Sequence, residues 1–277
     1  EDLSMLGKKD PNEEGYRHHY LLGIAYLACK EFTSLDNLLR WAFETEKCAD
    51  GNWNVLYAQY MYEHENIEKS LKIVEGMTPQ PPPLVTAALC KLYQEENEEA
   101  QKLAKQAFSD EFKNYTFDHP IANPYSIAHA ILGEVHNRNK NFPKALDELN
   151  KSLEIDPYNF LAHQLNVMVF KNMHEFDEAA SAAEKGLSLC PGQIFLVDTL
   201  VDYNLKKNNF EKAQQILEEQ RKYLQSHGEG ENAALLSEHI AKERNKDKSP
   251  EEIIVNEIQS GETAKCEFKS SLRWNLK

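Results

Sequence analysis

The chain is poor in glycine and carries no cysteine pattern that would fix a fold. Glycine accounts for 11 of the 277 residues, about 4% where roughly 7% is usual. The five cysteines are scattered without a C-x-x-C pair, which excludes a disulfide framework and a thiolate zinc site. No apolar run approaches the roughly 20 residues of a membrane helix. We therefore expect reduced, packed cysteines and no membrane-spanning segment.

Positive charge is also in short supply. The sequence has 31 Lys and Arg against 45 Asp and Glu, for a net charge of -14. Nucleic-acid-binding surfaces usually present a basic stripe, so nucleic acid binding by the body of the chain is not predicted. The first four residues carry neither a basic start nor an apolar stretch, and we expect a cytoplasmic protein. Because the chain does not begin with Met, we also expect a fragment of a longer protein.

What is abundant favours helices. The chain holds 31 Leu and 24 Ala against 13 Ile and 9 Val, so strong helix formers outnumber these β-branched residues by 55 to 22. The sequence therefore predicts an all-α body.

An internal repeat of 34 residues organises the second half of the chain. Three phenylalanines lie 34 residues apart, as do three alanines: Phe142, Phe176, Phe210 and Ala145, Ala179, Ala213. A polar turn precedes each phenylalanine, and Pro157 and Pro191 close two units at the same period. Several coincidences in one register predict a stack of repeats.

Each unit is predicted to contain two helices. In the clearest unit, 126–138 and 142–155 both carry apolar or small residues at helical spacing. Gly133 and Ala145 fall where the two helices would cross, and bulky side chains there would push the axes beyond the usual 8–10 Å or so.

This pattern resembles the tetratricopeptide repeat. The residues that match or substitute for its consensus are His129, Leu132, Gly133, His136, Ala145, Leu149, Ser152 and Pro157. The next unit departs from it at Asn166 and Val167, where Leu and Gly are typical. The resemblance implies a right-handed superhelix of paired antiparallel helices.

Upstream units are looser. We expect one over 16–49, a second from about Asp50 with a slip of a residue in its turn, and a third from Pro83 after the breaker run 79–83. The total is about six repeats. The segment 109–123 is too long for an ordinary turn and is expected to interrupt the stack as a bend or a contact loop.

Four regions follow. They are an N-terminal extension (1–15), the repeat domain (16–227), a capping helix over 231–244 with a linker (228–248), and the start of a truncated α/β domain (249–277).

The resemblance implies a concave face, lined by the first helix of each pair, that binds a peptide or a protein. The predicted partner-binding residues are Glu134, Asn137, Arg138, Gln164, Met168, Lys171, Asn172, Asp198, Asp202 and Lys206. Chaperone-binding repeats carry a basic clamp, which is absent here: the matching positions hold Ala130, Glu134, Leu165, Leu161 or Phe195, and Thr199. A co-chaperone module is therefore disfavoured, with an unusual site in an irregular N-terminal unit left open, and the first hypothesis is a protein-protein interaction scaffold.

Enzyme motifs are missing. The sequence has no Gly-rich phosphate loop, no G-x-S-x-G and no H-E-x-x-H, so we predict no catalytic residue, no cofactor and no enzyme activity for this chain. His129 and His136 share a predicted helix face, but packing explains them better than metal binding. The acidic run 95–99 falls in a turn and at the start of a predicted helix, where carboxylates are solvated and favoured by the helix dipole, so metal binding is not needed to explain it.

The C-terminal tail carries a different signal. A helix is predicted from Ser249 to Gly261, followed by a possible strand. Gly261, Glu262, Glu267, Phe268 and Lys269 resemble the opening of the Schlafen-like, AlbA-type nucleic-acid-binding domain, in whose nuclease members Glu262 and Glu267 would be partial metal ligands. The match covers some 25 residues, and no third carboxylate follows, so we expect no nuclease activity from this chain.

The tail supports the alternative hypothesis. In that interpretation the repeats are the N-terminal sensor or assembly arm of a larger nucleic-acid-binding or nuclease effector. The identity of the partner, the pathway and the oligomeric state do not follow from the sequence.

Overall fold

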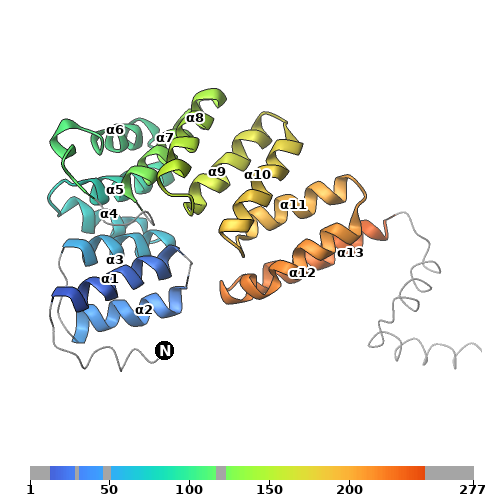
Figure 1. Cartoon of the computed structure of the whole chain (residues 1–277), viewed down its shortest axis with the longest axis horizontal. Helices are drawn as coiled ribbons and strands as arrows, with labels where there is room; N and C mark the ends of the chain where they lie inside the picture. Colours follow the sequence, from blue (N-terminus) through green and yellow to red (C-terminus); the bar gives the residue numbers. More distant parts are fainter. Residues whose placement is uncertain (1–12, 29–30, 46–50, 117–122, 247–277) are drawn as a thin grey trace, which may run out of the picture.

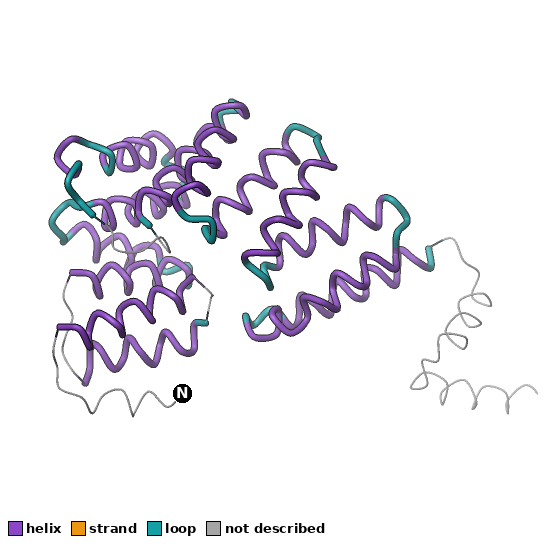
Figure 2. Tube along the Cα trace, in the orientation of Figure 1, coloured by secondary structure: helices purple, strands orange, loops and turns teal. Residues whose placement is uncertain are grey.

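In the computed structural model, residues 13–28, 31–45, 51–116 and 123–246 are described. Within these ranges the chain consists of helices joined by short loops, with no strand (Figure 2). The bounds of the first seven α-helices are α1 Glu13–Ala28, α2 Phe32–Arg40, α3 Gly51–Glu63, α4 Ile67–Glu75, α5 Pro81–Tyr93, α6 Asn97–Gln106 and α7 Pro124–Arg138. The remaining six are α8 Phe142–Ile155, α9 Phe160–Asn172, α10 Phe176–Leu189, α11 Ile194–Lys206, α12 Phe210–Ser226 and α13 Gly230–Arg244.

Successive helices form antiparallel pairs that stack into an arch, with α1–α3 in one leg and α11–α13 in the other (Figure 1). The first helices of neighbouring pairs pack on one another, whereas the second helices pack mainly on first helices. The first helices (α1, α3, α5, α7, α9 and α11) are therefore the inner helices, and their partners α2, α4, α6, α8, α10 and α12 are the outer helices.

One turn geometry joins the two helices of every pair. In each of six turns a backbone N–H donates to the carbonyl five residues earlier, a bond that closes a helix C-terminus. The donors are Glu31, Asn66, Glu96, Asn141, Glu175 and Asn209, at 2.8–2.9 Å. Five of these turns have a described left-handed residue just before the donor: Glu65, Glu95, Lys140, His174 and Asn208. A seventh turn of this geometry joins α12 to α13, where Glu229 N–H donates to the Leu224 carbonyl at 2.7 Å. The six helix pairs, followed by α13, agree with the expected count of about six repeats.

Buried residues, most of them Gly, Ala or Ser, lie where the paired helices approach closely; Leu35, Val167 and Val201 are the larger exceptions. The inner helices contribute Gly23, Ala58, Ala88, Gly133, Val167 and Val201, and the outer helices contribute Leu35, Ser70, Ala100, Ala145, Ala179 and Ala213, all of them buried. A Cβ on Gly133 would lie 2.8 Å from the Leu149 side chain and 3.3 Å from the Ala145 carbonyl oxygen. The sequence prediction of an all-α, tetratricopeptide-type superhelix is therefore confirmed.

The third unit begins earlier than the sequence predicted. Its inner helix α5 starts at Pro81, so Pro81, Pro82 and Pro83 form its first turn instead of ending a breaker run. Proline is tolerated there because the first N–H groups of a helix have no partner inside the helix.

Short outer helices explain the looser register upstream. The helices α4 and α6 have 9 and 10 residues, whereas α8 and α10 have 14 each. After α6 the chain forms a 3₁₀ turn over Asp110–Phe112, and Phe112 is buried beneath it. Residues 117–122 of the predicted interruption lie outside the described ranges.

The helix α13 falls where the capping helix was expected and packs on α11 and α12. The helix and strand predicted over 249–277, with Glu262 and Glu267, lie outside the described residues. In the part of the chain that is described, no helix is long and apolar enough to cross a membrane.

Candidate interaction groove

Exposure of the predicted partner-binding side chains increases along the stack of inner helices. On α7, Ala130, Glu134 and Asn137 are buried. The corresponding side chains of α9, Gln164, Met168 and Lys171, are partly exposed, as are Asp198 and Asp202 of α11. Arg138, Asn172 and Lys206, each at the end of its helix, are exposed. The partly exposed inner face of α9 and α11, which holds the accessible members of the predicted partner-binding set, is called the groove below.

The three predicted site residues of α7 are engaged with each other and with neighbouring units. Glu134 accepts hydrogen bonds from Arg138 Nε at 2.7 Å and from Asn137 Nδ2 at 2.9 Å. Arg138 Nη1 also donates to the Leu92 carbonyl at 3.1 Å and to Asn97 Oδ1 at 3.0 Å. These contacts, called the clasp below, hold α7 against the turn between α5 and α6.

The clasp continues into the next unit. Asn172 Nδ2 of α9 donates to Asn137 Oδ1 at 2.9 Å. Four of the ten predicted partner-binding residues therefore bond to one another inside the protein. Whether any of them also touches a partner stays a prediction.

Acidic and basic groups lie together on the inner face of α9 and α11. Asp198 and Asp202 lie one helical turn apart, and Lys171 Nζ sits 5.3 Å from the centre of the Phe195 ring. Burial raises the pKa of Asp198, the neighbouring Asp202 adds to the increase, and Lys171 and His239 oppose it. His239 Nε2 of α13 is 3.9 Å from Asp202 Oδ1. The groove thus combines a half-buried carboxylate with aromatic and cationic side chains.

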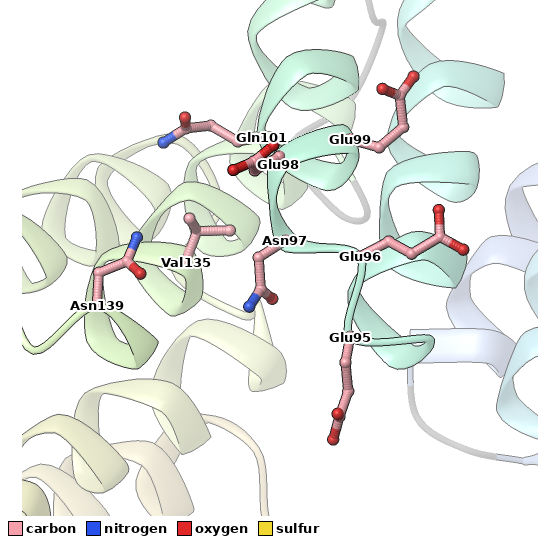
Figure 3. Close-up of a pocket in the computed structure, with 8 residues that line it drawn as sticks. All are labelled: Glu95, Glu96, Asn97, Glu98, Glu99, Gln101, Val135 and Asn139. Carbon is pink, nitrogen blue, oxygen red and sulfur yellow. The ribbon is translucent and has the colours of Figure 1, made fainter.

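A second concavity lies outside this groove, at the turn between α5 and α6. It is a cleft of about 620 Å³ lined by Glu95, Glu96, Asn97, Glu98, Glu99, Gln101, Val135 and Asn139 (Figure 3). Two of its carboxylates are paired, Glu96 with Lys91 at 3.1 Å and Glu99 with Lys102 at 3.0 Å. Glu98 and Glu99 lie in the first turn of α6, where negative charge is favourable. Among the described residues no group of three His, Cys, Asp or Glu could hold a metal ion.

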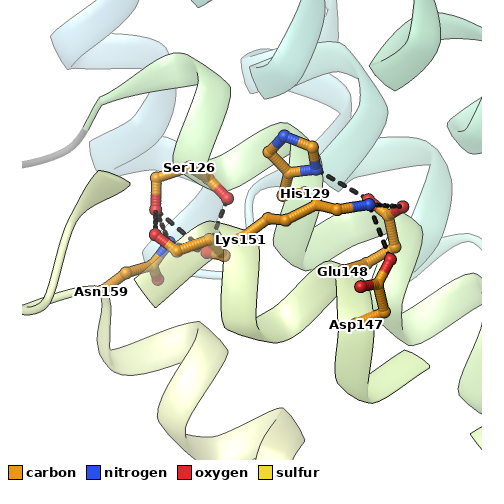
Figure 4. A network of polar contacts seen from close by, with 7 residues as sticks. Ser126, His129, Asp147, Glu148, Lys151 and Asn159 are labelled. Carbon is orange, nitrogen blue, oxygen red and sulfur yellow. Dashed lines mark hydrogen bonds and ion pairs between the residues drawn. The ribbon is translucent and has the colours of Figure 1, made fainter. Parts of the chain in front are cut away.

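His129 belongs to a polar network on the outer side of α7 (Figure 4). Its Nδ1 lies 2.7 Å from Glu148 Oε2, and Lys151 Nζ is 2.6 Å from Asp147 Oδ2 and 3.2 Å from Glu148 Oε1. The ring also packs on Phe108, with centroids 4.6 Å apart. His129 is therefore a packed and paired side chain, in agreement with the interpretation preferred from the sequence.

Sequence reasoning missed the partners of the predicted site. Leu92 and Asn97 precede Arg138 by 46 and 41 residues, so no local pattern connects them. If the repeats are aligned on the left-handed residues of their turns, Tyr62 and Glu63 of α3 match Asn137 and Arg138 of α7. This alignment identifies inner positions upstream that the sequence analysis did not name. The upstream turns were hard to recognise in the sequence because Glu65 and Glu95 occupy the left-handed position, where glycine usually marks the end of a helix.

Comparison with known proteins supports the fold. No protein-family model and no curated protein matches the sequence. A chain of the APC/C hetero-tetramer Cut9-Hcn1 matches with a TM-score of 0.58 at 16% identity, over 88% of this chain and 45% of that chain. The thermophilic TPR protein TTC0263 of Thermus thermophilus matches with a TM-score of 0.49 at 16% identity, over 66% of this chain and 97% of that chain. MamA AMB-1 matches at 0.42 and 14% identity, over 62% and 95%. At 16% identity the likeness to the Cut9-Hcn1 chain concerns the fold alone.

Proposed function

We propose that this chain is a cytoplasmic protein-protein interaction scaffold that holds a peptide or protein segment in the groove of α9 and α11. The observation that carries the proposal is the difference in exposure between units. Glu134 and Asn137 on α7 are buried and bonded inside the protein, whereas Met168 and Lys171 at the equivalent positions on α9 are partly exposed. Gln164 on α9 is partly exposed as well. A surface that exposes amide, cationic and apolar groups at regular spacing suits a peptide.

The side chains of the groove suit a ligand segment whose backbone forms hydrogen bonds with the protein and whose side chains are partly apolar. The amides of Gln164 and Asn172 are suited to the N–H and C=O groups of an extended or helical ligand. Met168 offers a flexible apolar contact, which adapts to irregular surfaces. Asp198, Asp202, Lys171 and Lys206 supply charges that select among ligands.

The C-terminal tail favours one alternative, in which the scaffold is the sensor or assembly arm of a larger nucleic-acid-acting effector. The motif from Gly261 to Lys269 is the observation behind it. Nucleic acid would then be bound by the C-terminal domain alone, while the groove would still bind a protein. The two functions are compatible.

Capture from a lysate of the source cells tests the scaffold. The full chain is immobilised, captured proteins are identified by mass spectrometry, and each is retested against the variant Lys171→Glu with Asp202→Lys. We expect this charge-reversed groove to lose a partner that the native chain retains.

A convex variant is the matched control. Lys185→Glu with Glu218→Lys exchanges the same charges on the exposed faces of α10 and α12. A partner that is lost with the convex variant but kept by the groove variant contradicts the proposed groove. Circular dichroism of both variants verifies that the helices are intact.

A further inference from the structure

The inner face of α11 carries two carboxylates, Asp198 and Asp202, and Lys171 and His239 offset the charge of Asp198 only in part. Asp198 is half-buried and has no hydrogen bond or ion pair among the described residues. Among the described residues, the group nearest to Asp202 that can carry positive charge is His239, whose Nε2 lies 3.9 Å from Asp202 Oδ1, close to the outer limit for an ion pair. Two carboxylates one turn apart on a helix repel each other. Both would be stabilised by a cation that arrives with a ligand.

Two lysines of the inner face, Lys171 of α9 and Lys206 of α11, lie over aromatic rings. Lys171 Nζ lies 5.3 Å from the Phe195 ring centre, and Lys206 Nζ lies 5.2 Å from the Phe176 ring centre. A cation at such a distance is attracted by the face of the ring. Among the described residues neither lysine forms an ion pair with Asp198 or Asp202, so a further cation can be accommodated beside the two carboxylates.

Apolar surface adjoins this position. Met168 on α9 and Phe195 on α11 are partly exposed members of the neighbouring core clusters. Contact with their side chains would remove apolar area from water, at about 25 cal/mol for each Å². A ligand that matches the groove thus needs apolar side chains next to a cationic one.

We infer that the partner segment held by the groove is a basic amphipathic peptide, with a Lys or Arg placed between Asp198 and Asp202 and apolar residues on Met168 and Phe195. This inference rests on the proposed function and adds the class of ligand. The net charge of -14 favours the approach of a cationic partner and disfavours nucleic acid.

The test uses two synthetic probes and the full chain. One is a fluorescein-labelled, capped 16-residue amphipathic peptide of Leu, Ala and Lys, and the other has Glu in place of every Lys. Fluorescence anisotropy at low salt should show at least about tenfold tighter binding of the lysine peptide. The double variant Asp198→Asn with Asp202→Asn should reduce that preference to less than about threefold.

A second pair of carboxylates controls for net charge. Glu218→Gln with Glu219→Gln removes the same two charges from exposed positions on α12, and it should leave the lysine peptide bound as tightly as before. Equal binding of both peptides by the native chain, binding of neither, or an equal loss in the α12 control overturns the inference. If capture depends on the groove while the lysine peptide shows no preference, the scaffold stands and only the ligand class fails.

Discussion

Arg138 is the residue on which the junction between the third and fourth units depends. Its guanidinium joins a nearly buried carboxylate, Glu134, to a backbone carbonyl and to Asn97 in a different helix. The side chain of Glu134 is 8% exposed and that of Arg138 is 33% exposed. A buried charge that loses its partner costs more than the pair itself gains.

Replacing Arg138 by Met keeps the apolar stem and removes the charge and the donors. We expect the free energy of unfolding to fall by about 1–3 kcal/mol, because Glu134 is left with one amide donor. Urea denaturation measures the change. The control is Arg244→Met, which breaks an exposed pair with Glu211 at 3.7 Å and should cost less than about 0.5 kcal/mol. Equal costs for the two variants would show that the clasp is unimportant.

The contribution of Asp198 to the free energy of unfolding depends on pH. Burial raises its folded-state pKa above the ordinary value of 3.8. Above pH 3.8 the unfolded chain loses this proton first, so stability falls as pH rises to the folded pKa and stays lower beyond it. A group that destabilises its own fold at neutral pH is common where a site serves binding.

We therefore expect Asp198→Asn to raise the denaturant midpoint at pH 7 and to raise it less at pH 4. Asp177→Asn should behave in the opposite way. Hydrogen bonds from Lys207 and Tyr203 hold the pKa of Asp177 below its ordinary value, so its contribution is present at pH 7 and is lost as pH falls through the folded pKa. A lower midpoint for Asp198→Asn at pH 7 would contradict this assignment.

At the scale of the helix, the crossing points set the spacing within each pair. Ala145 and Ala179 are buried at these points, and their neighbours already fill the space. Added volume in such a site forces side chains out of their rotamers or moves the backbone.

Ala145→Trp or Ala179→Trp should lower the free energy of unfolding by at least about 1–3 kcal/mol. Chemical denaturation monitored by circular dichroism measures this loss. Asn150→Trp, on the exposed face of the same helix as Ala145, controls for the introduced ring and should have a small effect. Unchanged midpoints for the alanine variants would mean that the crossing has been misplaced.

Much of the helical organisation could be predicted from the sequence, but not evenly. Units with 14-residue outer helices keep the 34-residue period, so Phe142, Phe176 and Phe210 revealed them. Where α4 and α6 are shorter, Ile67 and Asn97 stand at the phenylalanine position and the period is lost. The prolines at the start of α5 misled the prediction because proline both ends helices and begins them.

The site was less predictable than the fold. The resemblance to the repeat family supplied the expected concave-facing side chains, since the family pattern fixes the register of each inner helix. It could not separate Glu134, buried and bonded, from Met168, partly exposed, because burial depends on how neighbouring units are spaced. The contact of His239 with Asp202 joins residues 37 positions apart and has no counterpart in a local pattern.

At the scale of the whole molecule, stability should vary along the stack because each unit contacts only its neighbours. The terminal helix α13 packs on α11 and α12 and buries only Ala233 and Ile240. By contrast, α11 is contacted by α9, α10, α12 and α13, and it buries seven side chains.

Amide hydrogen exchange should follow this difference. We expect exchange in the centre of α13 to be at least about tenfold faster than in the centre of α11, because opening the end of the stack exposes little apolar surface. Mass spectrometry of peptides covering 196–205 and 232–241 measures both. Equal protection in the two helices would indicate one cooperative unit.

The left-handed turn residues have a consequence for how this protein tolerates change. An L-residue in that conformation costs about 1 kcal/mol or more, and glycine avoids most of that cost while adding freedom to the unfolded chain. Glycine substitution should therefore stabilise the fold at each left-handed position, namely Glu65, Glu95, Lys140, His174 and Asn208. Because each lies in a different repeat, glycine substitutions there should act independently and could offset destabilising changes acquired in the groove.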